Sequence, residues 1–217
     1  MEKIITMRSF KSGFTRKQLK SIQRATMNFK YRNIPCLKNP LDLVIYTKLI
    51  WDIKPATIFE FGSKAGGSSL FFSDICNNYN LNTEIISIDL FPPNDHPSSM
   101  VTFLEGNVLE IEKVFARHSL YDQPHPWLVI DDSAHSYNAC TTLLHFFAKH
   151  LLRGEYLIIE DGILDELGLS KKYEGGPNRA IKNFFRKNPD KFHIADDYCD
   201  MFGKNLTYNP NGYLRKI

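Results

Sequence analysis

Short runs of apolar residues recur along the chain, and they predict strands that are buried on both faces of a sheet. The runs lie at 57–61, 84–89, 101–104, 127–131 and 156–160. Each is apolar over most of its length instead of alternating with polar residues, which is typical of the central strands of a parallel sheet. Shorter runs at 192–195, 206–208 and 213–214 predict further strands near the C-terminus.

Helical segments separate most of these runs. Apolar residues recur at helical spacing from Pro40 to Asp52, and Pro55 ends the pattern. Further helices are expected at 70–77, at 137–152 and from Pro177 to about Asn188. The alternation of strands and helices predicts an α/β fold with a doubly wound, mostly parallel sheet.

Composition and charge describe a globular chain with no strong electrostatic preference. Its 217 residues are enough for one substantial domain, and 43% of them are apolar and 24% charged. Residues 1–30 are predicted to form a basic, partly amphipathic arm, solvated or in contact with another subunit, followed by the folded domain at 31–217. A net charge of +3 gives no reason to expect nucleic acid or an anionic membrane as the main partner.

The sequence also bears on location. No run approaches the roughly 20 apolar residues of a membrane-spanning helix, and basic residues interrupt the first 30 positions, so no signal peptide is expected. The cysteines have neither C-x-x-C nor zinc-finger spacing, which favours free thiols in a reducing compartment: they are Cys36, Cys76, Cys140 and Cys199. We therefore expect a cytoplasmic protein that spans no membrane.

Acidic residues stand at the ends of several predicted strands. In open α/β sheets ligands bind at the carboxyl ends of the strands, so these positions are informative. Carboxylates are costly to desolvate, and although a single one can cap the next helix, their repetition indicates a ligand. The residues are Glu60, Asp89, Asp131, Asp132, Glu160 and Asp161.

A glycine-rich turn, residues 62–69, follows the first predicted strand. Lys64 occupies the position where a dinucleotide fingerprint would need glycine, and the turn lacks the ending of a P-loop. Its glycines can still let the backbone approach a ligand, and Asp89 is placed to accept hydrogen bonds from a ribose diol. This pattern favours a nucleoside-containing cofactor. The alternative is that the glycines serve tight packing and that Asp89 caps a helix.

The later acids form a second cluster. Asp131-Asp132 and Glu160-Asp161 follow strands that would be neighbours, about 4.8 Å apart. Several carboxylates at one place stay ionised only beside a compensating charge, which a hard divalent cation such as Mg²⁺ supplies. The alternative is helix capping. His135 is the natural general base, because its ordinary pKa lies near neutrality and it follows these acids closely.

Several motifs together resemble the cephalosporin hydroxylase and rhamnosyl O-methyltransferase family. The likeness runs from about Tyr31 to the C-terminus, and it lies in Asn39-Pro40-Leu41-Asp42 with Tyr46, in 58–68, 130–137 and 154–161, in Gly175-Gly176-Pro177 and in 206–216. The resemblance implies the Rossmann-like, seven-stranded fold of class I methyltransferases, with S-adenosylmethionine in the crevice from Gly62 to Asp89 and Mg²⁺ at the later acids. Nothing resembles the 2-His-1-carboxylate triad of an iron oxygenase.

The resemblance also implies roles for individual residues. Glu60, Gly62, Ser63, Gly67 and Ser68 would surround the methionine part of the cofactor, Asp89 would bind its ribose, and Tyr46 would help to close the pocket. Asp132 and His135 would be catalytic, and Asp132, Glu160 and Asp161 would bind the metal. Asp131 is the alternative to Asp132. Family members often carry a D-x-D-H motif that would place the second aspartate at Ala134, whereas related macrolide-sugar methyltransferases carry a D-D-x-x-H form like Asp131 to His135.

The predicted function is Mg²⁺-dependent methylation of a sugar hydroxyl, on a nucleotide sugar, a polysaccharide precursor or a glycosylated natural product. The alternatives are a methyltransferase for a phosphoramidate, catechol or amine, and a noncatalytic subunit that binds the cofactor. Residues 162–176 are the longest irregular stretch between late elements and are expected to form a lid. A homo-oligomer is expected from the N-terminal arm.

Overall fold

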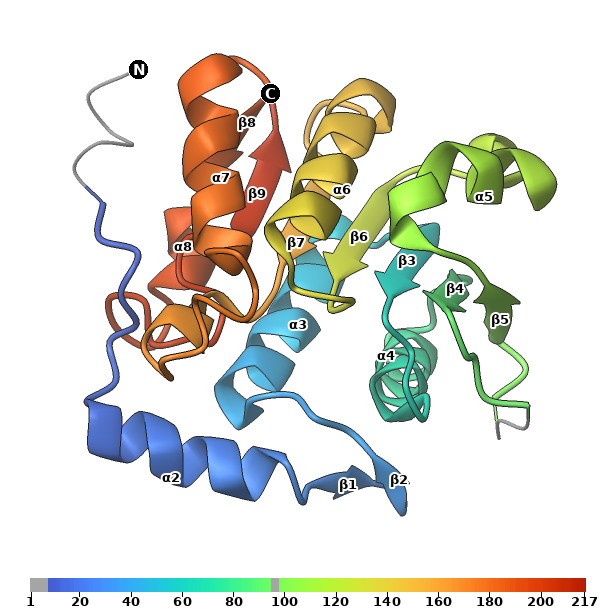
Figure 1. Ribbon diagram of the computed structural model, residues 1–217. Helices are drawn as coiled ribbons and strands as arrows, with labels where there is room; N and C mark the ends of the chain where they lie inside the picture. The colour runs from blue at the N-terminus through green and yellow to red at the C-terminus, as the bar shows by residue number, and fades with distance from the viewer. Residues whose placement is uncertain (1–7, 95–97) are drawn as a thin grey trace.

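A seven-stranded sheet forms the centre of the computed structural model, which describes residues 8–94 and 98–217 (Figure 1). Its strands are β3 (Thr57–Phe61), β4 (Glu84–Asp89), β5 (Val101–Glu105), β6 (Trp127–Asp131), β7 (Tyr156–Ile159), β8 (Phe192–Ile194) and β9 (Tyr213–Lys216). The order is β5-β4-β3-β6-β7-β9-β8, and all pairs are parallel except those that β9 makes with β7 and β8. The predicted doubly wound, mostly parallel sheet is confirmed, and it is the fold of class I methyltransferases.

Helices cover both faces of this sheet, and each face has its own apolar core. One core contains α3 (Pro40–Ile53), α4 (Gly67–Asn78) and the short α8 (Asp196–Cys199), and the other contains α5 (Ile111–Arg117), α6 (Tyr137–His150) and α7 (Gly176–Lys187). Alternate strand residues enter opposite cores: Ile58 belongs to the first, Phe59 and Phe61 to the second. This double burial explains why the strands read as continuous apolar runs.

One predicted strand is wrong. Residues 206–208 form bends instead of a strand. The Tyr208 backbone N–H donates to Asp42 Oδ2 at 2.9 Å, and the Thr207 hydroxyl donates to Asp42 Oδ1. A buried carboxylate at the start of α3 therefore binds this segment, and the β-type residues pack without joining the sheet.

The N-terminal residues that the structure describes lie against the domain. Helix α2 (Arg16–Thr26) begins with a capping box between Thr15 and Gln18 and runs beneath the carboxyl ends of the strands in Figure 1. Its Leu19 is fully buried beside Ile163 and Tyr208. A small hairpin, β1 (Lys30–Tyr31) and β2 (Ile34–Pro35), joins α2 to α3. Residues 8–30 therefore belong to the same body as the sheet, and residues 1–7 of the predicted arm lie outside the described residues.

Short 3-10 helices complete the chain: η1 (Val108–Glu110), η2 (Leu120–Asp122) and η3 (Gly162–Asp165). Within the described ranges, none of the helices combines the length and the apolar character needed to cross a membrane.

Candidate active site

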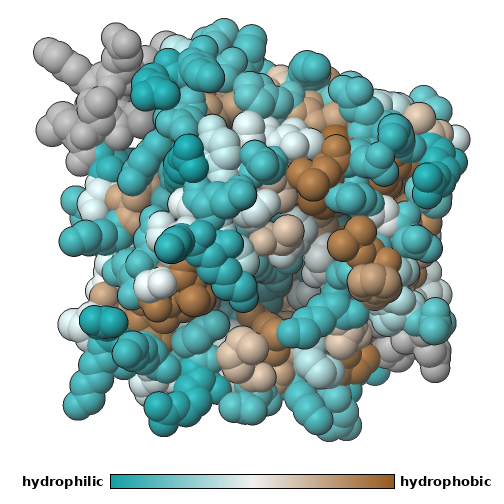
Figure 2. Space-filling view, in the orientation of Figure 1, coloured by the Kyte–Doolittle hydropathy of each residue, from teal (hydrophilic) through white to brown (hydrophobic). Residues whose placement is uncertain are grey.

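A cavity of about 710 Å³ lies at the carboxyl ends of β3, β4, β5, β6 and β7. Figure 2 shows the corresponding face as mostly hydrophilic, with separate apolar patches and a recess near its centre. Successive strands are added on one side of β3 as far as β5, and from β6 onward they are added on its other side. Such a switch point between β3 and β6 opens a crevice between the loops that follow these two strands. The cavity therefore lies where the fold favours a ligand.

The glycine turn after β3 forms one wall of the cavity. Gly62 has φ +99°, and a Cβ atom there would lie 2.1 Å from the Asp132 carbonyl oxygen, so only glycine lets the two loops approach this closely. The Ser63 hydroxyl is buried and has no hydrogen-bond partner among the described residues. Gly62, Ser63 and Ser68 all line the cavity.

Asp89, at the end of β4, also lines the cavity. Its carboxylate accepts hydrogen bonds from the backbone N–H groups of Lys64, at 2.9 Å, and Phe91, at 3.0 Å. These contacts tie the glycine turn to the end of β4 and fix the carboxylate at the rim. Of the predicted cofactor residues, the structure thus brings Gly62, Ser63, Ser68 and Asp89 together.

The other predicted cofactor residues lie behind the wall. Glu60 is fully buried and accepts hydrogen bonds from the hydroxyls of Ser68, Ser69 and Ser87. Burial raises the pKa of Glu60, and Lys38 opposes this effect. Tyr46 is also fully buried and donates to Glu160.

Gly67 sits under the β1–β2 hairpin, where a Cβ atom would lie 2.2 Å from the Pro35 carbonyl oxygen. Its closeness to the hairpin thus serves packing at the start of α4. Glu60, Tyr46 and Gly67 all support the cavity from outside it.

Sequence reasoning missed the segment after β5. Gly106, Asn107, Val108 and Leu109 line the cavity, and the Asn107 side chain caps η1 by accepting a hydrogen bond from the Leu109 backbone N–H at 3.0 Å. The rule that ligands bind at strand ends applies to this strand as well, so its Gly-Asn pair was a usable signal.

Asp132, His135 and Asp161 meet in the cavity. His135 Nε2 lies 3.7 Å from Asp132 Oδ1 and 3.5 Å from Asp161 Oδ2. One potential ligand atom from each of the three residues lies within 4.8 Å of the other two, a grouping that could hold a metal ion. Burial raises the pKa of Asp161, His135 opposes this, and Asp132 adds to it. A cation bound here would remove the cost of ionising both carboxylates.

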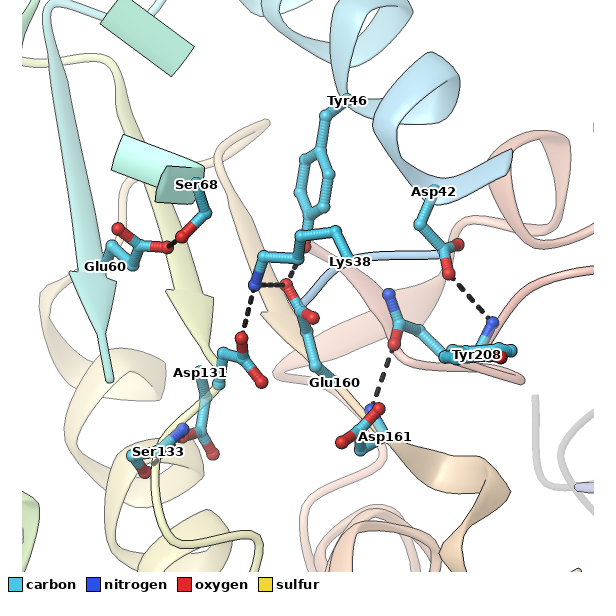
Figure 3. Close-up of polar contacts among 12 residues, drawn as sticks. Lys38, Asp42, Tyr46, Glu60, Ser68, Asp131, Ser133, Glu160, Asp161 and Tyr208 are labelled. Atoms are coloured by element: carbon cyan, nitrogen blue, oxygen red, sulfur yellow. Dashed lines mark hydrogen bonds and ion pairs between the residues drawn. The ribbon is translucent and has the colours of Figure 1, made fainter. Parts of the chain in front are cut away.

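Asp131 and Glu160, the first member of each acidic pair, do not line the cavity. Asp131 is buried, and its Oδ1 accepts hydrogen bonds from the Ser133 hydroxyl at 2.6 Å and backbone N–H at 3.2 Å. Glu160 Oε1 accepts from Lys38 and Tyr46, each at 2.6 Å (Figure 3). The four predicted metal ligands are therefore divided: Asp132 and Asp161 face the cavity, while Asp131 and Glu160 are held by the protein.

Lys38 was not identified from the sequence. Its ammonium group is buried and donates to Asp132 Oδ2 and Glu160 Oε1, both at 2.6 Å. Burial alone would lower the pKa of Lys38, but the carboxylates of Asp132, Glu160 and Glu60 raise it well above its usual value. A single lysine before a helix is normally solvated, so the sequence carried no signal of this role.

The remaining walls come from α2 and from the expected lid. Gln23 and Met27 approach from the N-terminal side, and Leu164, Leu169 and Tyr173 approach from the stretch 162–176. The Gln23 side-chain oxygen is buried and has no hydrogen-bond partner within the described part of the chain. The Tyr173 ring centroid lies 6.0 Å from that of His135. These residues place a mixed apolar and polar surface next to the acidic cluster.

Comparisons with known proteins agree on one family. The family model described as Rhamnosyl O-methyltransferase/CmcI matches residues 23–217. A rhamnosyl O-methyltransferase of Mycobacterium leprae is 25% identical over 99% of both chains. One of Mycobacterium tuberculosis H37Rv is 25% identical over 85% of this chain and 76% of that protein.

Solved structures share the fold. A CmcI structure described as "cmcI-D160 Mg-SAM" aligns with a TM-score of 0.69 and 22% identity, covering 88% of this chain and 77% of that one. The methyltransferase MycE of the mycinamycin biosynthetic pathway, in complex with Mg, SAH and mycinamycin VI, aligns with a TM-score of 0.51 and 16% identity. That alignment covers 68% of this chain and 44% of that one.

Proposed function

Because the chain belongs to the rhamnosyl O-methyltransferase/CmcI family, we propose that it transfers a methyl group from S-adenosylmethionine to a sugar hydroxyl, with Mg²⁺ bound at Asp132 and Asp161. The observation that carries the proposal is the meeting of Asp132, His135 and Asp161 in a cavity that the glycine turn also lines. The relatives named above are rhamnosyl O-methyltransferases, and one structural neighbour is described with Mg and SAM.

The residues of the crevice suit the cofactor. Gly62 lets the turn lie against the loop after β6. The Ser63 hydroxyl, which has no partner among the described residues, offers a hydrogen bond, and the fixed Asp89 carboxylate can accept from a ribose diol. The segment 106–109 adds a further part of the wall.

The donor set suits a hard divalent cation. Oxygen ligands from Asp132 and Asp161 match the preference of Mg²⁺, which usually keeps several waters beside one or two carboxylates. Glu160 would reach such an ion only through its second oxygen, because Lys38 and Tyr46 bind the first. When bound, S-adenosylmethionine supplies an electrophilic methyl group, and Mg²⁺ stabilises negative charge on the acceptor.

The chain itself would handle the proton and exclude water. A sugar hydroxyl is a weak nucleophile, and His135 is placed to take its proton at Nε2, the ring nitrogen that lies beside Asp132 and Asp161. Leu164, Leu169 and Met27 add apolar surface that limits the access of water to the reacting groups.

A polar acceptor fits the remaining space. The unpaired Gln23 oxygen would accept a hydrogen bond from a hydroxyl group, and a buried polar atom without a partner is costly unless a ligand satisfies it. This favours a sugar over an apolar acceptor. The predicted homo-oligomer and cytoplasmic location stay predictions.

The test is transfer of labelled methyl from S-adenosylmethionine to a panel of sugar nucleotides, glycosides, catechols and amines. We expect transfer to sugars, a loss of at least about 100-fold in EDTA, and recovery with Mg²⁺. Asp161→Asn should behave like the chelated enzyme, and Asp122→Asn, a change in an exposed carboxylate, should retain activity.

Each other outcome has a definite meaning. Full activity in EDTA would remove the metal from the proposal. Transfer confined to catechols or amines would favour the alternative acceptors, and cofactor binding without any turnover would favour a noncatalytic subunit.

A further inference from the structure

Lys38 places a buried positive charge between carboxylates from two strand ends. Its side chain is 1% exposed, and its ammonium group lies 2.6 Å from Asp132 Oδ2 and 2.6 Å from Glu160 Oε1. Figure 3 shows the contact between Lys38 and Glu160. Lysine is almost never fully buried unless it is paired. Since Lys38 precedes α3 and the two acids follow β6 and β7, the ion pairs join three segments that are distant in the sequence.

The carboxylates around Lys38 outnumber its single positive charge. Asp132, Glu160 and Asp161 bring three carboxylates together, and Lys38 supplies one positive charge. With all three acids ionised and His135 neutral, the cluster carries a charge of −2, which one divalent cation would neutralise. The geometry leaves Asp132 Oδ1 and Asp161 Oδ2 on the side of His135, away from the oxygen atoms that Lys38 binds.

We propose that Lys38 is a positioning residue that acts as a resident counter-charge of the acidic cluster. It holds Asp132 and Glu160 in place before a metal binds, and it reduces the attraction of the cluster for divalent cations so that one ion is bound reversibly. The part that concerns the cation rests on the proposed function. The part that concerns the alignment of the carboxylates rests on the contacts of Lys38 alone.

The test replaces Lys38 by methionine, which has similar length and no charge, in protein purified with Mg²⁺. Mn²⁺ affinity, measured by calorimetry or electron paramagnetic resonance, should rise by about tenfold or more, because the cluster loses a positive charge at close range. In EDTA the melting temperature should fall by about 10 °C, because a buried ion pair is broken. Added Mg²⁺ should raise the melting temperature of Lys38→Met by more than it raises that of the unsubstituted protein.

Lys48→Met is the matched control. Lys48 pairs with Asp52 through a side chain that is 54% exposed, so the same chemical change there should shift the melting temperature by about 2 °C or less and leave Mn²⁺ affinity within about twofold. If Lys38→Met does not fold, Lys38→Gln provides a second variant, which keeps a hydrogen-bond donor and should change both quantities in the same direction by less.

The outcomes separate the two proposals. Unchanged or weaker Mn²⁺ binding in Lys38→Met or Lys38→Gln would overturn the assignment of Lys38 and leave the proposed function standing. Failure of both variants to fold even with Mg²⁺ would also overturn it, because an added cation should replace the missing charge. No Mn²⁺ binding by the unsubstituted protein would remove the cation from the proposed function and from the assignment of Lys38, whereas the alignment of the carboxylates would still be tested by the melting temperature of Lys38→Met in EDTA.

Discussion

The strand-end carboxylate at β3 and those at β6 and β7 differ in what surrounds them. Glu60, at β3, is satisfied entirely by the hydroxyls of Ser68, Ser69 and Ser87 and does not reach the cavity. Asp132 and Asp161 lie in the cavity beside His135, and Asp132 also binds the ammonium group of Lys38.

Carboxylates near the same edge of the sheet therefore have two uses. Glu60 pairs in register with Ile130, two residues before Asp132, and its hydroxyl partners hold it behind the wall of the cavity. At β6 and β7, one member of each acidic pair is bound within the protein outside the cavity lining, and the other member lines the cavity. A strand-end acid indicates a site only when its oxygen atoms are not already satisfied by the chain.

The largest effect, on turnover, is expected from His135→Ala. If turnover did not fall, the acids at β6 and β7 would not differ from Glu60 in their use. Turnover should fall by about 10³-fold, because the cavity-facing cluster would lose its general base. The affinity for S-adenosylmethionine, measured by calorimetry, should stay within about twofold, since His135 lies with the acids and not on the glycine turn. A large loss of cofactor binding would contradict this role, and a loss of Mn²⁺ binding would place His135 among the metal ligands instead.

Asp42 is a buried carboxylate whose hydrogen bonds all come from the protein, and its effect on stability can be tested by varying pH. Burial raises the pKa of Asp42 from 3.8 to about 6, although Thr207, Tyr208 and Tyr213 donate hydrogen bonds to it. As pH rises from 3.8 the unfolded chain loses this proton while the folded protein keeps it, so the free energy of unfolding should fall by about 3 kcal/mol up to about pH 6.

The measurement compares the unsubstituted protein with Asp42→Asn, which lacks this titration. The difference between their free energies of unfolding in urea should change by about 3 kcal/mol in favour of Asp42→Asn between pH 4 and 7. A difference that does not vary with pH would show that Asp42 titrates alike in the folded and unfolded chain.

A smaller effect, on stability alone, is expected at the Glu60 cluster. Ser69→Ala removes a hydroxyl that donates to the buried Glu60 carboxylate, and unfolding should require about 2 kcal/mol less. Mn²⁺ affinity should stay unchanged, because neither Glu60 nor Ser69 lines the cavity. Ser21→Ala, on the exposed side of α2, is the control and should leave both quantities unchanged. A changed Mn²⁺ affinity in Ser69→Ala would show that the Glu60 cluster and the Asp132–Asp161 cluster are coupled, and the distinction between them would be wrong.

The sequence predicted correctly those features of the fold that depend on a few neighbouring residues. The central strands were predicted closely because burial on both faces demands continuous apolar residues, and Gly62 was singled out because glycine lets the backbone approach other groups closely. Segment 206–208 was mistaken for a strand because Thr207 and Tyr208 are also buried, although they donate hydrogen bonds to Asp42 and do not join the sheet.

The sequence by itself determined the α/β architecture and the presence of acids and a histidine at the ends of the strands, because both follow from residue type and spacing over a few positions. Only the tertiary structure decided which acids face the cavity, that Lys38 lies between Asp132 and Glu160, and that Gln23 and Met27 of α2 form a wall. The reason is that hydrogen bonds and ion pairs between distant segments satisfy some polar groups and leave others free to bind a ligand. Which groups are satisfied depends on how the whole chain is arranged in the fold, and no short stretch of sequence determines it.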